Sequence, residues 1–378
     1  MNVRFIDRIS DCSAAAWNLV AGIDYPFLRH EFLDALETSG SVGGESGWQP
    51  FHALLFDQDM LVAVMPLYLK SHSYGEYVFD WSWADAYQRN GLPYYPKLVT
   101  AIPFTPATGN RIATNNLEAA TACDYFCKAI TQQLKQKNFS GWHVLFPEQE
   151  ESLHLEKAGL LDRIGVQYHW FNQGYQSFDH FLNTFKSRQR KNLRKERRRV
   201  YEQNVSLSIL TGDQLTPDIW QHFYRFYQAT YAKRSGHGGY LTREFFQLIG
   251  KHMASQIVMV MAYQDDIPIA AALNFQSSNT LYGRYWGAIR EIDGLHFETC
   301  YYQGIEYCIA NGLQRFDPGA QGEHKIQRGF TPVNTHSMHW IAHEGFRKAI
   351  GRFLEEESSQ VSRYTEHSKQ FLPFKNTD

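Results

Sequence analysis

One strand–turn–strand–turn–strand unit occurs twice in the chain, and this repeat restricts the possible folds more than any other feature. The copies lie at residues 51–83 and 256–288. Gln58-Asp59 in the first turn corresponds to Gln264-Asp265, and Ser71 corresponds to Ser277, both 206 positions later. The predicted strands are 51–56, 60–69 and 76–83 in the first copy and 257–263, 267–275 and 281–286 in the second. Two copies within 378 residues predict two domains of one mixed α/β class.

The segments after each copy follow the same order. A helix comes next, then a short strand, a second helical segment and a last strand. In the first half the helix, at 116–135, has an apolar stripe formed by Cys123, Phe126, Cys127, Ile130 and Leu134. The segments are 116–135, 142–146, 153–158 and 167–171 after the first copy, and 298–310, 314–317, 324–330 and 335–342 after the second. We therefore expect domains at 1–175 and 206–356, a basic connecting helix at 176–205 and a polar tail at 357–378.

The net charge of the chain and its cysteines indicate which cellular compartment and which kinds of partner to expect. The formal net charge is −2, so any anionic partner must bind a local basic patch. The five cysteines form no C-x-x-C pair, which is typical of reduced thiols in the cytoplasm. The N-terminal segment is charged, and no apolar run reaches the length of about 18 residues needed to span a bilayer. We expect a cytoplasmic protein without a membrane span.

Two segments break the symmetry of the repeat. Residues 82–111 form a long irregular insertion, and such insertions in compact domains are often functional. Residues 186–199 contain nine Lys or Arg side chains and a single acid, Glu196. This basic segment is either a solvated helix or a surface for a polyanion, and we favour tRNA, a nucleotide-linked precursor or anionic lipid headgroups at a peripheral membrane contact.

Three long motifs resemble the bacterial FemAB-like family of predicted N-acyltransferases. They are Ser82-Trp-Ala-Asp-Ala-Tyr-Gln-Arg-Asn-Gly-Leu-Pro-Tyr-Tyr-Pro-Lys97, Pro103-Phe-Thr-Pro-Ala-Thr-Gly-Asn-Arg111 and Phe316-Asp-Pro-Gly-Ala-Gln-Gly-Glu-His-Lys-Ile-Gln-Arg-Gly-Phe330. The resemblance implies two tandem GNAT-like domains, the fold of acyl-CoA N-acyltransferases. It also implies an acyltransferase similar to the Fem-type enzymes, which use aminoacyl-tRNA to lengthen the bridge peptides of peptidoglycan.

The sequence departs from that resemblance at the carrier site. Acetyl-CoA-using GNAT domains have an R/Q-x-x-G-x-G/A loop whose main-chain N–H groups hold the pyrophosphate. Neither half has it, since the corresponding segment of the second half is Arg290-Glu-Ile-Asp-Gly-Leu-His-Phe-Glu298 and the first half offers only 105–111. We therefore expect aminoacyl-tRNA rather than acyl-CoA as the donor, and no tightly bound cofactor.

The glycine-containing loop at 319–328 is the main catalytic candidate. It brings together Glu323, His324, Lys325 and Arg328. We expect Glu323 or His324 to handle the proton, and Lys325 or Arg328 to meet phosphate or a developing oxyanion. The alternative interpretation is a charged surface turn that caps a helix.

Further cations are candidates for binding the carrier. Strand alternation places Arg284 and Trp286 on one face, where they either grip a base or phosphate or close the edge of the core. The expected carrier-binding residues are Arg328, Arg284, Trp286, Arg194, Lys195, Arg198, Lys233 and Arg234. The expected acceptor-binding residues, which could equally form a buried lid, are Trp83, Asp85, Tyr87, Arg89 and Arg111. We expect no metal, because His336 and His339 point to opposite faces of a strand.

We therefore expect an N-acyltransferase that moves an acyl or aminoacyl group from a carrier ester or thioester onto an amine. The second domain holds the carrier and the chemistry, and the first holds the acceptor, a small molecule or a peptide such as a peptidoglycan precursor. The alternatives are an acyl-CoA-dependent N-acetyltransferase and a non-catalytic relative that binds RNA or a precursor. The acyl group, the acceptor and the oligomeric state are left open.

Overall fold

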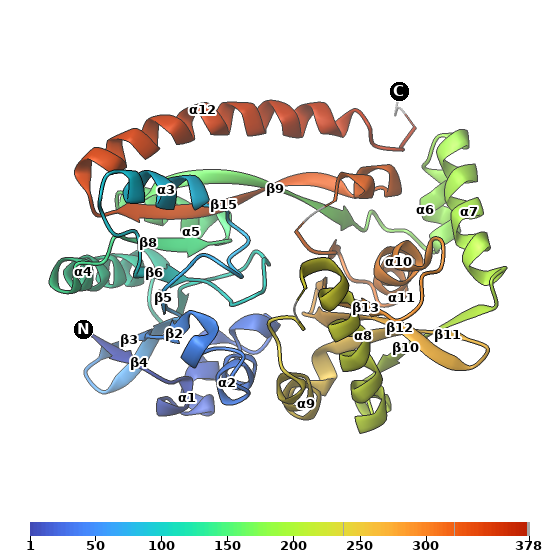
Figure 1. Ribbon diagram of the computed structural model, residues 1–378, viewed down its shortest axis with the longest axis horizontal. Coiled ribbons are helices and arrows are strands. Elements are labelled where there is room, and N and C mark those ends of the chain that lie inside the picture. Colours follow the sequence, from blue (N-terminus) through green and yellow to red (C-terminus); the bar gives the residue numbers. More distant parts are fainter. Residues whose placement is uncertain (237, 321, 376–378) are drawn as a thin grey trace. The chain divides into compact units, whose positions relative to one another are not determined.

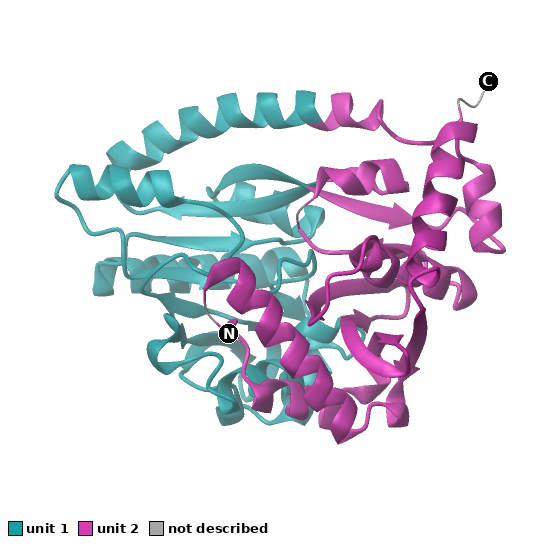
Figure 2. Ribbon diagram, turned by 45° about the vertical axis from the view of Figure 1, so that its right-hand side comes forward, with its two compact units in different colours: residues 1–166, 334–364 teal, residues 167–333, 365–378 magenta. Residues whose placement is uncertain are grey.

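The computed structural model describes residues 1–236, 238–320 and 322–375. The chain forms two compact units, shown in separate colours in Figure 2. Unit 1 contains residues 1–166 and 334–364, and unit 2 contains residues 167–333 and 365–378. Each unit thus combines two segments of the chain, whereas the expected domains were contiguous ranges. No helix of the described part is long and apolar enough to cross a membrane.

Unit 1 contains two sets of strands with helices packed against them (Figure 1). Strands β1, β3, β4 and β7 form one sheet, and β15, β8, β6, β5 and β2 are neighbours in the other. The strands are β1 (Asn2–Ile6), β2 (Trp48–Pro50), β3 (His52–Asp57), β4 (Met60–Met65), β5 (Tyr68–Lys70), β6 (Lys97–Thr100), β7 (Ala113–Thr114) and β8 (Gly141–Leu145). The helices are α1 (Ala14–Ala21), α2 (His30–Thr38), α3 (Trp81–Arg89), α4 (Ala119–Lys137) and α5 (Gln149–Lys157).

Unit 2 contains a sheet in the order β10, β11, β12, β13, β14 and β9. Its strands are β10 (Val205–Thr211), β11 (Ile257–Gln264), β12 (Ile267–Gln276), β13 (Thr280–Ala288) and β14 (Arg315–Asp317). Its helices are α6 (Phe178–Asn183), α7 (Ser187–Tyr201), α8 (Pro217–Ser235), α9 (Arg243–His252), α10 (Leu295–Phe297) and α11 (Gln303–Ala310). A π-helical turn, η6 (Glu298–Tyr302), joins α10 to α11, and a 3₁₀ segment, η7 (Glu323–Arg328), follows β14. The strands and helix expected in the second copy are confirmed.

The last strand of each repeat completes the sheet of the other unit. β9 (Leu161–Phe171) and β15 (Thr331–Ile341) each begin in one unit and end in the other. The C-terminal end of β9 pairs with β14 in unit 2, and the C-terminal end of β15 pairs with β8 in unit 1. Each unit also contains a parallel pair of strands: β6 pairs with β8 in unit 1, and β13 pairs with β14 in unit 2. The repeat seen in the sequence is therefore present in the pairing pattern.

Apolar spacing explains the helices that cover the sheets. The predicted stripe of α4 is confirmed, because Cys123, Phe126, Ile130 and Leu134 are buried in the core of unit 1. In unit 2, α8 begins with Thr216, whose hydroxyl accepts a hydrogen bond from the N–H of Ile219. Gly287 of β13 allows a close approach of α8, since a Cβ there would lie 2.2 Å from the carbonyl carbon of Phe226. This approach fixes the end of β13 that leads to the candidate site.

Four expectations about individual segments are wrong. The single connecting helix expected at 176–205 is instead two helices, α6 and α7, which are separated at residues 184–186. The expected strand 60–69 is interrupted at Pro66, which lacks the N–H that a continuous strand requires. The expected strand 76–83 is absent: residues 76–80 are irregular and α3 begins at Trp81, where Trp83 and Tyr87, one helical turn apart, pack into the same buried cluster. The expected tail from residue 357 is instead helical as far as Lys369, within α12 (Glu344–Lys369).

Candidate active site

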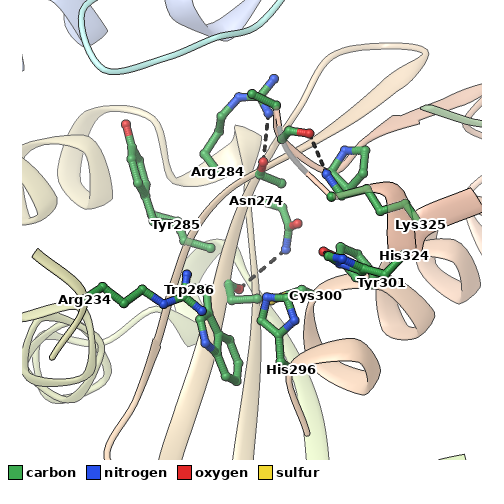
Figure 3. A pocket seen from close by; sticks show the side chains of 17 residues that line it. Arg234, Asn274, Arg284, Tyr285, Trp286, His296, Cys300, Tyr301, His324 and Lys325 are labelled. Atoms are coloured by element: carbon green, nitrogen blue, oxygen red, sulfur yellow. Dashed lines mark hydrogen bonds between the residues drawn. The ribbon is translucent and has the colours of Figure 1, made fainter. Parts of the chain in front are cut away.

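A cavity of about 420 Å³ opens in unit 2 where β13 separates from β14 (Figure 3). The size is in the range of small-ligand sites. Five residues expected from the sequence line it: Arg234, Arg284, Trp286, His324 and Lys325. The other lining side chains include Asn274, Tyr285, His296, Cys300 and Tyr301. The structure thus brings together residues from α8, β12, β13, the helical segments after β13 and the loop after β14. We call this cavity the reaction pocket.

Local irregularity of β13 creates the reaction pocket. β13 pairs with β14 only from Thr280 to Tyr282. Its pairing with β12 shifts register beyond Leu273, so that Arg284 is an extra residue on β13. From Gly283 onward β13 has no strand partner on its β14 side among the described residues. Main-chain groups of this segment therefore border the cavity, where they are candidates for binding a carbonyl oxygen.

Arg284 is locked by a carboxylate on the neighbouring strand. Its guanidinium makes two hydrogen bonds to Asp317, one of them 3.1 Å long, and both side chains are 1% exposed. Burial alone would raise the pKa of Asp317, but Arg284 and His169 hold it far below its usual range. The charge of Arg284 is therefore largely compensated, so Arg284 supports the wall of the reaction pocket more than it attracts an anion.

Lys325 is a buried cation that makes no ion pair with a carboxylate of the described residues. Its ammonium group donates a hydrogen bond to the carbonyl of Gly319 at 2.6 Å, and the residue is 1% exposed. Burial lowers the pKa of Lys325 to about 8, despite the opposing effect of Asp317. Lys325 is consequently mostly charged at neutral pH and close to losing that charge, as a group used in catalysis often is.

The π-helical turn η6 supplies Cys300 and Tyr301 to the reaction pocket, and such turns are frequent at functional sites. The Tyr301 hydroxyl lies 3.0 Å from Nε2 of His324. Burial raises the pKa of Tyr301, so the phenol stays protonated. Partial burial together with Arg328 and Lys325 lowers the pKa of His324, so its imidazole is neutral at neutral pH. A neutral imidazole beside a phenol is able to accept a proton.

A second cavity of about 690 Å³ adjoins the first and shares Arg234, Trp286 and His296 with it. Its floor includes Trp286, Ile292 and Leu295. Lys233 also lines it, paired with the exposed Glu291. Burial and the nearby Arg234 lower the pKa of His296 to about 3, so His296 is neutral. The two cavities have room for an elongated ligand whose anionic part meets Arg234.

Two of the residues expected in the loop at 319–328 lie outside the reaction pocket. Glu323 is exposed and does not line it. Arg328 turns away, donating hydrogen bonds to Glu196 at 2.7 and 3.2 Å and to the carbonyl of His324 at 2.7 Å. Its guanidinium also stacks on Phe297, 3.6 Å from the ring centre. Arg328 therefore holds the loop in place and does not face the ligand space.

The basic segment forms α7, and its cations divide between two faces. Leu193 and Val200 are buried on the inner face, and Arg197 lies beside them. The helical spacing gathers four cations on the opposite face: Arg188, Lys191, Lys195 and Arg198. No ion-pair partner is found for these four in the part of the chain that the structure describes. Arg194 pairs with Asp179 at 2.8 Å, and both side chains are largely exposed.

In unit 1, most of the expected acceptor residues are sealed in the core. Trp83 and Tyr87 are 4% and 2% exposed. Arg111 is fully buried and donates hydrogen bonds to the carbonyls of Ala107, Gly109, Asn110 and Leu145. Only Asp85 and Arg89 of this set are at the surface, where they pair with each other along α3. Trp83, Tyr87 and Arg111 therefore fit the alternative interpretation, a buried lid, better than an acceptor-binding role.

Sequence reasoning missed several lining residues. Asn274 lies inside a strand and donates a hydrogen bond to the carbonyl of Val258 at 3.1 Å. A buried Asn within an apolar strand was the available signal for this position, because such a side chain needs a specific partner. Cys300 and Tyr301 gave no signal, because their orientation depends on the π-helical register of η6.

The fold resembles three solved structures. FemX aligns with a TM-score of 0.53 and 11% identity, covering 93% of this chain and 100% of that chain. The C-terminal domain of a candidate lysylphosphatidylglycerol synthetase from Agrobacterium fabrum aligns with a TM-score of 0.51 and 10% identity, covering 92% and 97%. A protein of unknown function from Bacteroides thetaiotaomicron aligns with a TM-score of 0.50 and 11% identity, covering 90% and 99%. At these identities the likeness concerns the fold. No curated protein sequence matches significantly.

The two repeated α/β units, with a pocket beside a strand that leaves its parallel neighbour, have the fold of FemX. The particular family follows from the sequence. Residues 8–376 match the FemAB-like family model, described as peptidoglycan biosynthesis and recognition. The chain belongs to the FemAB-like family, as its motifs indicated.

Proposed function

We propose that this protein is an N-acyltransferase that moves an aminoacyl group from tRNA onto an amine of a peptidoglycan precursor. The observation that carries the proposal is the reaction pocket, where Lys325, His324 and Tyr301 meet beside the free edge of β13. The family match supports the biosynthetic role. Acyl transfer to an amine needs a proton acceptor and stabilisation of an oxyanion, and the pocket offers both.

In the proposed reaction, the acceptor nitrogen attacks the ester carbonyl of the donor. The neutral imidazole of His324 takes the proton from that nitrogen, and Tyr301, 3.0 Å away, orients the ring. The ammonium group of Lys325 stabilises the negative charge that develops on the carbonyl oxygen. The C–O bond of the ester then breaks, an amide forms, and the hydroxyl of the carrier leaves with a proton.

The outer cations of α7 support RNA as the carrier. Arg188, Lys191, Lys195 and Arg198 follow one another at intervals of three or four residues, so they form a stripe along one side of α7. A stripe of uncompensated cations attracts a phosphodiester chain. Arg234, which lines both cavities, is placed to meet the phosphate nearest the ester. On the acceptor side, Asp85 and Arg89 of unit 1 are the remaining candidates.

A transfer assay tests this proposal. The protein is incubated with tRNA charged with labelled amino acids and with a nucleotide-linked peptidoglycan precursor, and labelled amide is identified by mass spectrometry. We expect product with the wild-type protein and almost none with Lys325→Met. A parallel reaction with acyl-CoA tests the competing donor.

Two outcomes would overturn the proposal, and a third would overturn the role of Lys325. Transfer from acyl-CoA with none from aminoacyl-tRNA would make the carrier a thioester. Absence of product from either donor, together with tight binding of RNA, would favour the non-catalytic relative. Equal product from the wild type and from Lys325→Met would remove Lys325 from the mechanism.

A further inference from the structure

Side chains on the inner face of α7 contact η6 and η7, the two helical segments that supply residues to the reaction pocket. Two adjacent residues make these connections, Glu196 and Arg197, although neither lines the pocket. We propose that Glu196 and Arg197 are positioning residues, which hold η6 and η7 in the geometry that the chemistry requires. The inference rests on the proposed function of the reaction pocket and assigns a second role to a helix whose outer face we expect to bind the carrier.

Arg197 holds η6 through its first residue. Its guanidinium donates hydrogen bonds to both carboxylate oxygens of Glu298, at 2.6 and 2.9 Å, and to Glu306 at 2.8 and 3.0 Å. Glu298 is 0% exposed and also accepts hydrogen bonds from Gln303 and Tyr201. A buried carboxylate with a bidentate arginine partner has one well-defined position. Cys300 and Tyr301 come two and three residues after Glu298, so the position of Glu298 fixes theirs.

Glu196 holds η7 through Arg328. Its carboxylate accepts two hydrogen bonds from Arg328, at 2.7 and 3.2 Å, and one from the hydroxyl of Tyr302. Arg328 in turn donates to the carbonyl of His324 at 2.7 Å. The same guanidinium contacts the Tyr302 hydroxyl at 2.9 Å, which links η7 directly to η6. Glu196 thereby connects the loop of His324 and Lys325 to the turn of Tyr301.

These contacts reach two segments with uncommon backbone conformations. The loop before η7 includes Gly319 and Gly322, both at positive φ, and a π-helical turn is an uncommon conformation. The described residues of neither segment pair with a strand. Since a displacement of about 1 Å in a reacting group can reduce the rate on the order of 10²-fold, external anchors have a direct effect on catalysis.

Neighbouring residues on α7 provide a matched experiment. Arg197→Gln and Arg198→Gln remove the same charge and the same side chain from adjacent positions, one on the inner and one on the outer face. We expect Arg197→Gln to lower kcat by about 10- to 10²-fold with little change in KM for the charged tRNA. We expect Arg198→Gln to raise KM for the charged tRNA. We expect Glu196→Gln to change kcat and KM in the same way as Arg197→Gln. We expect an intermediate kcat for Arg197→Lys, because lysine keeps the charge but lacks the planar guanidinium that binds two carboxylates.

A second measurement does not depend on catalysis. Cys300 lies in η6, so its rate of alkylation by iodoacetamide, followed by mass spectrometry of its peptide, reports the order of that turn. We expect the rate to rise severalfold in Arg197→Gln and in Glu196→Gln and to stay unchanged in Arg198→Gln. Circular dichroism confirms that each variant is folded before the comparison.

The outcomes separate this inference from the proposed function. Faster alkylation of Cys300 in Arg197→Gln and Glu196→Gln supports positioning even if no transfer reaction is found. The same alkylation rate in the inner and outer variants, or the same change of kcat and KM in both, would overturn it.

Discussion

Two of the buried lysines, Lys97 of unit 1 and Lys325 of unit 2, have opposite kinds of partner. In unit 1, Lys97 is 0% exposed and its ammonium group lies 2.8 Å from Glu76 and 2.8 Å from the hydroxyl of Ser73, with Asp80 as a further partner. In unit 2, Lys325 is 1% exposed, faces a cavity, and has a main-chain carbonyl as its hydrogen-bond acceptor.

The carboxylates decide what burial does to each charge. Burial alone would lower the pKa of Lys97, but Glu76 and Asp80 raise it above its ordinary value. For Lys325 the effect of burial prevails, and the pKa falls to about 8. A lysine sealed with carboxylates stays charged and serves the structure, whereas a lysine beside a cavity and an uncharged acceptor is available for chemistry. Burial by itself therefore does not identify a functional group.

The largest expected effect is on the stability of unit 1. Lys97→Met leaves Glu76 and Asp80 buried without their cation, and breaking a buried ion pair in this way costs about 3–5 kcal/mol of unfolding free energy. Urea denaturation measures the loss. As a control, Lys348→Met removes the exposed partner of Glu344 and should cost less than about 1 kcal/mol. Equal effects of the two substitutions would show that the cluster of Lys97 has no special role in folding.

The next effect is on catalysis in unit 2. Lys325→Met removes the proposed stabiliser of the oxyanion and should lower kcat about 10²- to 10³-fold, as does the loss of an oxyanion-binding donor in other enzymes. Because Lys325 pairs with a main-chain carbonyl and with no carboxylate of the described residues, its removal should not lower the thermal stability. Single-turnover kinetics and a thermal melt measure the two quantities. A large loss of thermal stability with an unchanged kcat would instead give Lys325 the structural role that we assign to Lys97.

The third effect is a pH dependence that only Lys325 should produce. A lysine is charged below its pKa and neutral above it, so the charge needed for the oxyanion is present below about pH 8 and lost as the pH rises. Activity should therefore fall on the alkaline side with a midpoint near pH 8. Lys325→Arg should move this midpoint upward, because arginine keeps its charge. An alkaline limb that is the same in Lys325→Arg would assign the titration to another group.

The smallest effect concerns the outer face of α7. Lys195→Ala should weaken RNA binding uniformly among sequences and reduce the slope of log K against log salt by about one. Filter binding at several salt concentrations measures both. Arg194→Ala is the matched comparison, and because Arg194 already pairs with Asp179 we expect a smaller change. An unaltered slope in Lys195→Ala would remove this face from the binding surface.

Much of the fold was predictable because periodicity and turns report local structure directly. The strands of the second copy and the stripe of α4 follow from alternation and helical spacing. The strand expected at 76–83 failed because Trp83 and Tyr87 gain more from packing as a helix than their β propensity provides. The exchange of β9 and β15 between units is a long-range pairing, which no local pattern contains.

The catalytic part of the candidate site was predictable because several charged residues share one short segment. His324 and Lys325 were recognised in this way, and the cavity contains both. For isolated residues the sequence gives the charge but not the burial. Arg111 and Arg234 are the same residue type, yet one is sealed against four carbonyls and the other lines a cavity. That difference arises from the tertiary structure alone.

The exchange of β9 and β15 has a practical consequence for anyone who divides the gene. A fragment ending at residue 166 would encode β8 without β15, its antiparallel partner, and would expose a strand edge to intermolecular association. A fragment beginning at residue 172 would lack the part of β9 that pairs with β14. The two halves of the reading frame are thus not independent modules, and the protein should be expressed and engineered as a whole.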